Sequence, residues 1–420
     1  MVNETLPTPP SGAGVRRPFT LSAFRGLRFD PARVGDLGTV ISPPYDVLDA
    51  DIVRDLEATN RRNIVRLILS RRFERPYLAV RDRLLKWREK GYLRADDDPA
   101  LYLYEYVADG TTVRGLIGLA GLRTEDERVI LPHEGVMPGP VDDRTVLMRT
   151  TETNLEPILL VHEGTERLRA LISDAAAVEP SAQFVALDGS VHRLWAVSDT
   201  SVLDAIGVEL AGTQALIADG HHRYAAYLRL QAELRDPDAA DGDSPWDSGL
   251  ALLVDQRDHP LHIGPIHRSV GALTMADVSE ISADRGDDFA TFPDREAAFA
   301  ALARDTAAQE DGDSAAFVVS DGRAWAVLRT KRSGPVDASV LHEVLLPAWG
   351  VAEEQIGYHH SLDQALHTTA RQPGIVIAVQ PPTVAEVMGT AAAGVRMPRK
   401  STSFAPKPRM GLVMRDLRDA

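Results

Sequence analysis

The chain has 420 residues, and its 46 basic and 61 acidic side chains give a formal net charge of -15 at pH 7. It contains no cysteine, which excludes a disulfide framework, a thiolate metal site and a cysteine nucleophile. The negative balance argues against a broad nucleic-acid-binding surface, because phosphate backbones are held by clustered lysine and arginine.

Hydrophobic residues make up 44% of the chain and charged residues 25%, which are the proportions of a soluble globular protein. No apolar run approaches the roughly 20 residues that span a membrane. The polar start at residues 1–17, rich in proline and threonine, is predicted to be a disordered tail and not a signal peptide. We therefore expect a cytoplasmic protein without a membrane or nucleic-acid partner.

Residues 18–125 are predicted to form an N-terminal α/β region. Apolar residues recur at helical spacing over residues 77–90, which predicts an amphipathic helix. The following segments are predicted to form two strands joined by an Asp-Gly turn, a strong hairpin signal: residues 101–107, the turn at Asp109 and Gly110, and residues 113–122.

Residues 126–270 are predicted to form the core of the protein. Residues 123–150 are polar with few periodic features and are predicted to be loop. Strands and helices are then predicted in alternation: strand 155–161, helix 166–176, a hairpin of strands 184–187 and 192–197, strand 214–218, helix 224–234, an exposed loop over 236–248, and strand 250–254.

Residues 271–395 are predicted to form a C-terminal α/β region, followed by a basic segment at 396–420 that closes on the site. The predicted elements here are an α/β unit over 275–330, helices 338–348, 362–370 and 383–393, and strand 375–379. Alternating strands and helices with hairpins among them predict an α/β (α+β) fold with mixed sheets.

The most informative segment is the strand-turn-helix pattern at residues 215–224. A buried strand ends at Asp219, Gly220 permits a positive φ, and three side chains that can carry positive charge open the helix: His221, His222 and Arg223. A helix N-terminus presents free N–H groups and a positive dipole end, so the pattern predicts a phosphate cradle. Asp219 could hold a metal ion or orient a histidine. The alternative is that Asp219 only caps the helix and the histidines are solvated.

The sequence Gly-His-His-Arg-Tyr-Ala-Ala-Tyr at residues 220–227 resembles the nucleotide-phosphate motif of the ParB and sulfiredoxin superfamily. His221 stands where sulfiredoxins place their reactive cysteine, so sulfiredoxin chemistry is excluded. The same segment resembles the corresponding loop of the free serine kinases. The resemblance implies a ParB/sulfiredoxin-like nucleotide-binding core in which Gly220, His222 and Arg223 hold the phosphates of ADP or ATP.

Further blocks along the chain resemble the bacterial and archaeal family catalogued as domain of unknown function 1015, from about residue 18 to 415. Their order and spacing carry the resemblance, and the implied association with serine metabolism follows from the likeness of the loop to serine kinases. The blocks are residues 43–48, 131–134, 143–144, 154–158, 265–268 and 397–408.

Two pairs, each of a carboxylate next to a basic side chain, supply candidate chemistry upstream of the phosphate loop. A carboxylate beside a histidine can act as a general base, and Glu134, next to His133, is the best positional match to the glutamate that plays this part in the serine kinases. Catalysis is accordingly assigned to Glu134, His133 and His222. Asp143 and Arg144 could add a metal ligand and a phosphate clamp. The alternatives are a loop pair without a role and a surface salt bridge.

The remaining phosphate candidates lie towards the C-terminus. His267 and Arg268 follow apolar sequence and could contact phosphate, unless they are ordinary core or surface residues. Lysine is scarce in the chain, so the basic segment is notable, and it could close over a nucleotide or be a disordered tail. Its candidate residues are Lys400, Ser401, Thr402 and Lys407, and Tyr45 and Asp46 are candidates to line the same pocket.

Metal binding without thiolates requires carboxylates or histidines. His359, Asp363 and His367 recur every four residues but give only a weak zinc pattern. A Mg²⁺ ion held by Asp219, or more weakly by Asp143, together with phosphate oxygens is the more natural expectation.

These observations predict an enzyme, a nucleotide-dependent phosphotransferase that acts on a small hydroxyl compound such as free serine or phosphoserine. Glu134 would remove the hydroxyl proton, while positioning and electrostatics would supply most of the acceleration. Two alternatives remain open: a small-molecule phosphatase with the same cradle, and a non-catalytic nucleotide-binding sensor.

Overall fold

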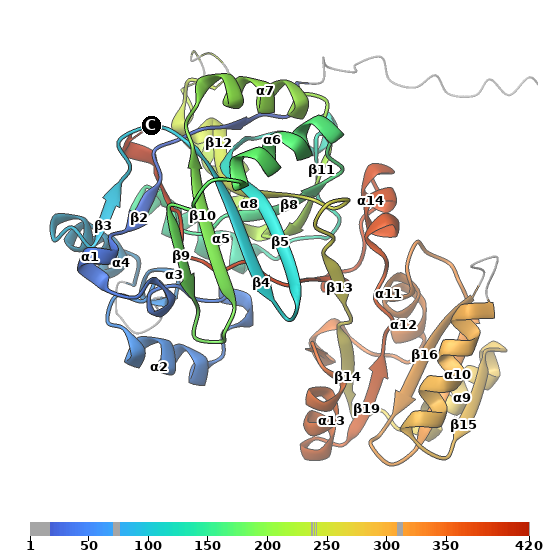
Figure 1. Ribbon diagram of the computed structural model, residues 1–420. Coiled ribbons are helices and arrows are strands. Elements are labelled where there is room, and N and C mark those ends of the chain that lie inside the picture. Colours follow the sequence, from blue (N-terminus) through green and yellow to red (C-terminus); the bar gives the residue numbers. More distant parts are fainter. Residues whose placement is uncertain are drawn as a thin grey trace, which may run out of the picture.

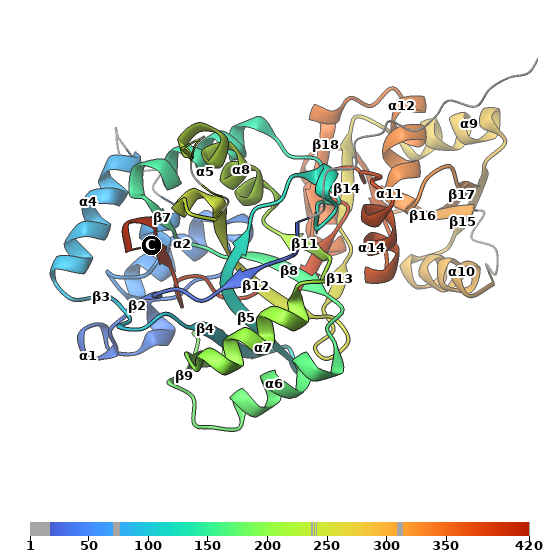
Figure 2. The same cartoon turned by 90° about the horizontal axis from the view of Figure 1, so that it is seen from above.

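The computed structural model describes residues 17–69, 76–308 apart from 237, 239 and 241, and 314–419, and it forms two lobes (Figure 1). The first lobe is built on a large mixed sheet and contains both ends of the described chain. The second lobe is built on a smaller sheet and lies beside the first (Figure 2). The predicted tail at residues 1–16 lies outside the described residues.

Nine strands of the described chain form the sheet of the first lobe in the order β6-β11-β8-β12-β5-β4-β10-β9, with β1 paired to β5. Pairing is parallel between β6 and β11 and between β8 and β12, and antiparallel elsewhere. The α/β fold with mixed sheets is therefore confirmed. The strands are β1 (Leu21–Ser22), β4 (Leu101–Ala108), β5 (Thr111–Gly121), β6 (Ile130–Leu131), β8 (Ile158–His162), β9 (Ala182–Val185), β10 (Val191–Val197), β11 (Ala215–Asp219) and β12 (Ser248–Asp255).

The hairpin of β4 and β5 forms where the Asp-Gly turn was predicted. Asp109 and Gly110 both have positive φ, 51° and 75°, as a tight two-residue hairpin turn requires. In β4, the tyrosines at 102, 104 and 106 pack into one hydrophobic cluster and the leucines at 101 and 103 into another. This alternation shows that both faces of the sheet are covered.

The helices of the first lobe include several that the sequence pattern did not predict, among them α2, α5 and α7. Residues 138–150, predicted to be loop, form most of α5, and that prediction was wrong. Two short strand pairs, β2 (Leu27–Phe29) with β3 (Leu93–Ala95) and β7 (Thr153–Asn154) with β21 (Arg415–Asp416), accompany the helices. The helices are α1 (Pro31–Val34), α2 (Ala50–Thr59), α3 (Val65–Ile68), α4 (Pro76–Glu89), α5 (Pro138–Thr151), α6 (Glu166–Ala176), α7 (Thr200–Leu210) and α8 (His221–Leu234).

The second lobe has a sheet of six described strands in the order β15-β17-β16-β19-β14-β18. The helix predicted at 338–348 is present but contains a π-helical turn at Leu341–Leu345 between α11 and α12. The strands are β14 (His267–Gly271), β15 (Asp288–Phe292), β16 (Ser314–Ser320), β17 (Trp325–Lys331), β18 (Ile356–His359) and β19 (Gly374–Ala378). The helices are α9 (Met275–Arg285), α10 (Arg295–Ala308), α11 (Asp337–Val340), α12 (Leu346–Ala348), α13 (Leu362–Arg371) and α14 (Val384–Ala392).

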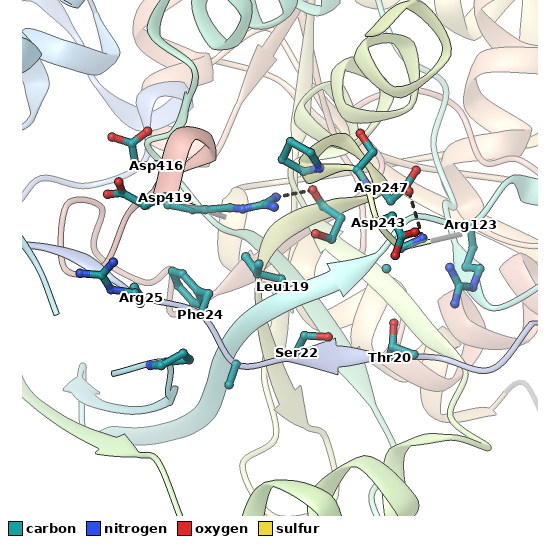
Figure 3. Close-up of a pocket in the computed structure, with 18 residues that line it drawn as sticks. Thr20, Ser22, Phe24, Arg25, Leu119, Arg123, Asp243, Asp247, Asp416 and Asp419 are labelled. Atoms are coloured by element: carbon teal, nitrogen blue, oxygen red, sulfur yellow. Dashed lines mark hydrogen bonds between the residues drawn. The ribbon is translucent and has the colours of Figure 1, made fainter. Parts of the chain in front are cut away.

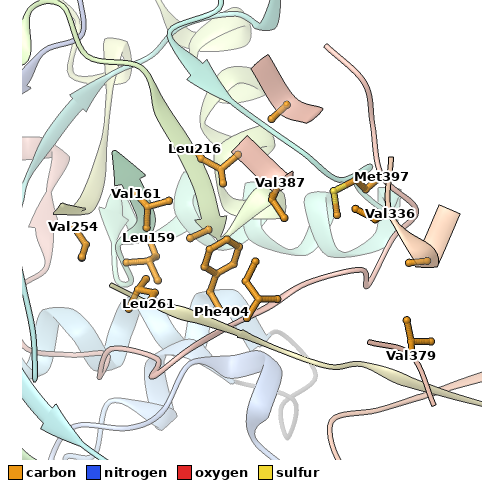
Figure 4. Packing of buried hydrophobic residues seen from close by; sticks show 14 of the residues in the cluster. Leu159, Val161, Leu216, Val254, Leu261, Val336, Val379, Val387, Met397 and Phe404 are labelled. Carbon is orange, nitrogen blue, oxygen red and sulfur yellow. The ribbon is translucent and has the colours of Figure 1, made fainter. Parts of the chain in front are cut away.

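The chain crosses between the lobes twice, and the two crossings pair with each other. β13 (His262–Gly264) leads to the second lobe, β20 (Ser403–Ala405) leads back, and they form an antiparallel pair (Figure 1). Phe404 of β20 lies in a buried cluster that also contains Leu216 of the first lobe and Val387 of the second (Figure 4). The junction between the lobes is therefore packed by apolar side chains.

The two sheets do not follow the predicted domain boundaries at residues 125 and 270. Strands from both sides of residue 125 belong to the first sheet, and β14 at 267–271 belongs to the second. We propose a division that follows the sheets, with residues up to about 264 and the returning segment from about 403 in the first lobe.

Candidate functional site

The strand-turn-helix motif forms as the sequence predicts. β11 ends at Asp219, Gly220 has φ +97°, and α8 begins at His221. A Cβ atom at residue 220 would lie 3.0 Å from the Ile158 side chain and 3.1 Å from Arg223 Nε, so the turn requires glycine. Because Gly220 offers no side chain to cap α8, the N–H groups of the first helical turn are left to face a ligand.

The first turn of α8 opens onto a cavity of about 340 Å³ at the junction of the lobes, here called the inter-lobe cavity. Five other segments meet there, among them the returning segment before and within β20. Ten of the predicted residues line the cavity: Tyr45, Glu134, Asp219, Gly220, His221, His222, Arg223, Lys400, Thr402 and Lys407. Predicted residues from distant parts of the sequence are thus brought to one place.

Asp219 is held between two cations. Its Oδ1 accepts a hydrogen bond of 2.8 Å from Lys407 Nζ, and its Oδ2 accepts one from the Arg223 guanidinium. Burial acts to raise the pKa of Asp219, but Lys407 and Arg223 outweigh it and lower that pKa to about 2. Asp219 is therefore a carboxylate that joins the motif to the C-terminal segment.

Arg223 is occupied inside the protein. Its side chain is 1% exposed, pairs with Asp219 and donates to the carbonyl oxygen of Pro157. Burial acts to lower the pKa of Arg223, but Glu156 and Asp219 raise it overall. Internal carboxylates thus neutralise the charge of Arg223, and its contact with phosphate stays a prediction.

His221 and His222 are neutral in this structure. The Nε2 atom of His221 accepts from the backbone N–H of His133 at 3.4 Å, and that of His222 accepts from Met137 N–H at 3.1 Å. Burial lowers the pKa of both, that of His221 to about 3. An imidazole that accepts a hydrogen bond at Nε2 must carry its proton on Nδ1, so neither ring supplies a positive charge at neutral pH.

The Glu134 carboxylate binds the loop before β20. Its Oε2 accepts from Lys400 N–H at 3.1 Å, and its Oε1 accepts from Ser401 N–H, Thr402 N–H and Thr402 Oγ1, each at 3.0 Å. Lys400 has φ +60°, a conformation that turns successive N–H groups towards one anion. Glu134 therefore fixes the C-terminal segment at the mouth of α8.

His133 lies behind Glu134 and is fully buried. Its Nε2 is 2.7 Å from Thr402 Oγ1, which also contacts Glu134. Burial lowers the pKa of His133 to about 3. His133 does not line the cavity, so its geometry suits a positioning residue for Thr402 and Glu134.

Lys400 and Lys407 carry the ammonium groups of the cavity. Lys407 is paired with Asp219, whereas Lys400 makes no ion pair within the described part of the chain. Lys400 also contributes to lowering the pKa of His222, which places its charge near the first turn of α8. Lys400 is therefore the cation most available to a ligand.

Asp143 and Arg144, predicted to be a metal ligand and a phosphate clamp, lie away from the lining of the cavity. Arg144 is buried, pairs with Asp143 and Glu156, and lies 4.7 Å from the centre of the Tyr45 ring. Asp143 accepts from the Tyr77 hydroxyl at 2.6 Å. Arg144 thus supports the cavity wall through Tyr45, which itself lines the cavity. The side chain of Asp46 lies outside the described part.

His267 and Arg268 lie on β14 and do not line the cavity either. Arg268 is fully buried, donates to Lys400 O at 3.0 Å and to His342 Nε2 at 3.1 Å, and so holds the main chain of the C-terminal segment. Burial lowers the pKa of His267 to about 4. His359, from the weak zinc pattern, is instead hydrogen-bonded through its Nε2 to the hydroxyl of Ser269. In the part of the chain that the structure describes, no three His, Asp or Glu side chains are grouped to hold a metal.

The sequence pattern did not single out some lining residues. His360, after β18, brings the second lobe to the cavity, and Met137 and Pro140 bring the start of α5. The adjacent histidines at 359 and 360 could have pointed to a second-lobe contribution to the site. The contribution of α5 was missed because residues 123–150 were predicted to be a loop.

The family model described as "Protein of unknown function (DUF1015)" matches residues 21–355. No curated protein matches the sequence. No helix of the described chain is both long and apolar enough to pass through a membrane.

Three solved structures resemble the chain at low identity. A free serine kinase in complex with AMP is 16% identical, with 71% of this chain and 91% of that chain covered and a TM-score of 0.38. A conserved hypothetical protein from Pyrococcus furiosus is 16% identical, with 73% and 96% covered and a TM-score of 0.37. SbnI with a C-terminal truncation, from Staphylococcus aureus, is 12% identical, with 71% and 87% covered and a TM-score of 0.39. TM-scores this low carry no argument about ligand or activity.

Proposed function

The chain belongs to the DUF1015 family of proteins of unknown function, and we propose that its inter-lobe cavity transfers a phosphoryl group between a nucleotide, ATP or ADP, and a small hydroxyl compound. The observation that carries the proposal is the convergence of three features on one cavity: the uncapped first turn of α8, the ammonium group of Lys400 and the carboxylate of Glu134. The first turn of α8 and Lys400 can bind a phosphate, and Glu134 can accept the proton of a hydroxyl acceptor.

The phosphate would be held by the N–H groups of the first turn of α8 and by Lys400. The helix N-terminus supplies directed donors and a partial positive charge, and Lys400 supplies a full charge that the described protein leaves without an ion pair. Together they can stabilise the charge on the transferring group, which is the main requirement of phosphoryl transfer. Arg223 would act indirectly, by fixing Asp219 and the turn.

The Oε2 atom of Glu134 is the oxygen that a substrate hydroxyl would approach. Oε1 accepts three hydrogen bonds and Oε2 accepts one, so Oε2 is the less occupied acceptor. In the proposed step Glu134 takes the hydroxyl proton, the hydroxyl oxygen bonds to the terminal phosphorus, and the bond from that phosphorus to the bridging oxygen breaks. The nucleotide leaves with that electron pair.

A protein-bound Mg²⁺ does not fit the predicted carboxylates. Asp219 accepts from Lys407 and Arg223, and Asp143 accepts from Arg144 and Tyr77. A metal ion at either position would have to displace a cation or a hydroxyl. The proposed step therefore takes no metal ligand from these residues.

The acceptor class can be tested by incubating the protein with ATP or ADP and a panel of free amino acids. We expect transfer to a hydroxyl amino acid, with free serine as the first candidate acceptor and phosphoserine as its product, from the resemblance of the loop. Glu134→Gln should abolish turnover while nucleotide affinity changes less than threefold. Glu125→Gln, at an exposed pair with Arg396 in the same neighbourhood, is the matched control. The absence of any transfer product would contradict an enzyme of this class.

A second candidate, a nucleotide sensor, is favoured by one observation. Glu134 accepts hydrogen bonds from the N–H groups of the loop before β20, which connects the lobes. A phosphate that competes for the same N–H groups would release that loop. In this case nucleotide would bind without turnover, and Glu134→Gln would alter nucleotide affinity more than any catalytic rate.

A further inference from the structure

A second cavity, here called the β1 cavity, lies in the first lobe away from the inter-lobe cavity. It has a volume of about 520 Å³ and shares no lining residue with the inter-lobe cavity. Figure 3 shows Ser22 of β1 and the preceding Thr20 on one side and Asp243, Asp247, Asp416 and Asp419 on the other. Its walls therefore join the start of the described chain to its end.

Arg415 lines the β1 cavity and has no acidic partner in the described chain. Its side chain is 97% buried, since only 3% is exposed. Its Nη1 donates to Ser248 O at 2.7 Å, and its buried Nε has no hydrogen-bond partner. Burial lowers the pKa of Arg415 to about 10, with a small opposing effect of Tyr227. A buried guanidinium with only a carbonyl partner is costly unless an anion joins it.

Three of the four carboxylates around the cavity are already neutralised. Asp247 pairs with Arg235 at 3.0 Å, Asp416 with Arg88 and Arg418, and Asp419 with Arg88 at 3.0 Å. Arg25, at the opposite wall, donates to the carbonyl oxygen of Asp96 and makes no ion pair within the described residues. The charge that the fold leaves unbalanced at this cavity is therefore positive, apart from the exposed Asp243.

Apolar side chains complete the wall beside these cations. Phe24 and Leu119 line the cavity and are largely buried, at 7% and 9% exposed. They offer a surface for an apolar group. Asp243, the carboxylate that no arginine pairs with in the described chain, disfavours a ligand with two negative charges, because like charges repel.

We propose that the β1 cavity is a binding site for a small organic monocarboxylate, whose carboxylate pairs with Arg415 and whose apolar part packs on Phe24 and Leu119. The planar guanidinium matches a carboxylate in a two-bond geometry. This site is independent of the proposed phosphoryl transfer and needs no nucleotide.

The test uses three probes of nearly the same shape with the full chain: benzoate, phenylphosphonate and benzyl alcohol, titrated by calorimetry or by ligand-observed NMR. Benzoate should bind at least tenfold more tightly than either of the others. Equal affinities of benzoate and benzyl alcohol would overturn the proposal, and so would tighter binding of phenylphosphonate.

Variants locate the bound carboxylate. Arg415→Met should retain the fold, because it removes an unbalanced buried charge. It should lower the affinity for benzoate at least tenfold. Ser22→Trp, at an exposed position of the lining, should block binding by volume if Arg415→Met fails to fold. Arg33→Met on α1, outside both cavities, is the control. ADP affinity measured in the same variants should stay unchanged, which separates failure of this site from failure of the inter-lobe cavity. Benzoate affinity that is indifferent to both lining variants would refute the site.

Discussion

Two cationic segments meet at the inter-lobe cavity, and they use their charge differently. In the turn at 220–223, Arg223 is neutralised by internal carboxylates, and His221 and His222 are neutral acceptors. In the C-terminal segment, Lys400 stays without an ion pair in the described chain. The segment that carries the recognisable motif thus builds the cavity and offers backbone N–H groups. The segment that arrives from the other end of the chain brings the available charge.

The largest expected effect tests whether Arg223 belongs to the scaffold. Arg223→Met removes one partner of a buried ion pair and should lower the free energy of unfolding by roughly 3–5 kcal/mol, measured by chemical denaturation. Arg229→Met, on the exposed face of the same helix, should change it by no more than about 1 kcal/mol. A stable Arg223→Met protein that had lost only nucleotide affinity would make Arg223 a ligand contact.

Lys407 connects the two segments through Asp219. Lys407→Met leaves the Asp219 carboxylate with Arg223 alone, so the free energy of unfolding should fall by roughly 1.5–3 kcal/mol, the range for a hydrogen bond to a charged group. The pKa of Asp219 should rise at the same time, because the cation that lowers it most is lost. Unchanged stability in urea would show that the segments are held together by other contacts.

The neutral histidines predict a pH dependence with a definite sign. The pKa of His133 is about 3 in the folded protein, below its usual unfolded value near 6.5, so the unfolded chain binds more protons between these values. Stability is therefore complete above about pH 6.5 and is lost as the pH falls towards 3. Between pH 7 and 5 the free energy of unfolding should fall by on the order of 1–2 kcal/mol more in the wild-type protein than in His133→Asn. Equal losses in the two proteins would mean that His133 is not held neutral.

The smallest expected effect concerns the pair that was predicted to assist the phosphate. Asp143→Asn should lower the free energy of unfolding by about 1 kcal/mol or less, because the Asp143 side chain is 45% exposed and such pairs contribute little. Nucleotide affinity should not change, since Asp143 does not line the cavity. A tenfold loss of nucleotide affinity in Asp143→Asn would show that Asp143 takes part in nucleotide binding.

Sequence patterns predicted many of the strands and helices but missed α2, α5 and α7, and for α5 there is a physical reason. The buried face of that helix carries Arg144, Thr145 and Thr151 among its apolar residues, so apolar periodicity is weak. The hairpins were predictable because Asp-Gly pairs adopt positive φ, as at Gly110. Local signals of this kind do not depend on the rest of the chain.

The assembly of the site could be predicted only in part. The motif at 219–223 was visible because the turn is local, but the pairing of β13 with β20 joins segments about 140 residues apart and has no local signal. For the same reason the sequence could not show that Glu156 would neutralise Arg144 and act on Arg223. Predicting cationic residues is thus easier than predicting which of them remain available to a ligand.

The most direct test of the account is calorimetric titration of ATP and ADP, with Mg²⁺ present, into the wild-type protein and into Lys400→Gln, with Lys331→Gln on β17 as the matched lysine control. We expect ATP or ADP to bind the wild-type protein at micromolar to millimolar concentrations. We also expect nucleotide affinity to be at least tenfold weaker in Lys400→Gln, equivalent to about 1.4 kcal/mol, with the control unchanged. No binding to the wild-type protein, or equal affinity in the Lys400 variant, would contradict the assignment of the inter-lobe cavity as a nucleotide-phosphate site.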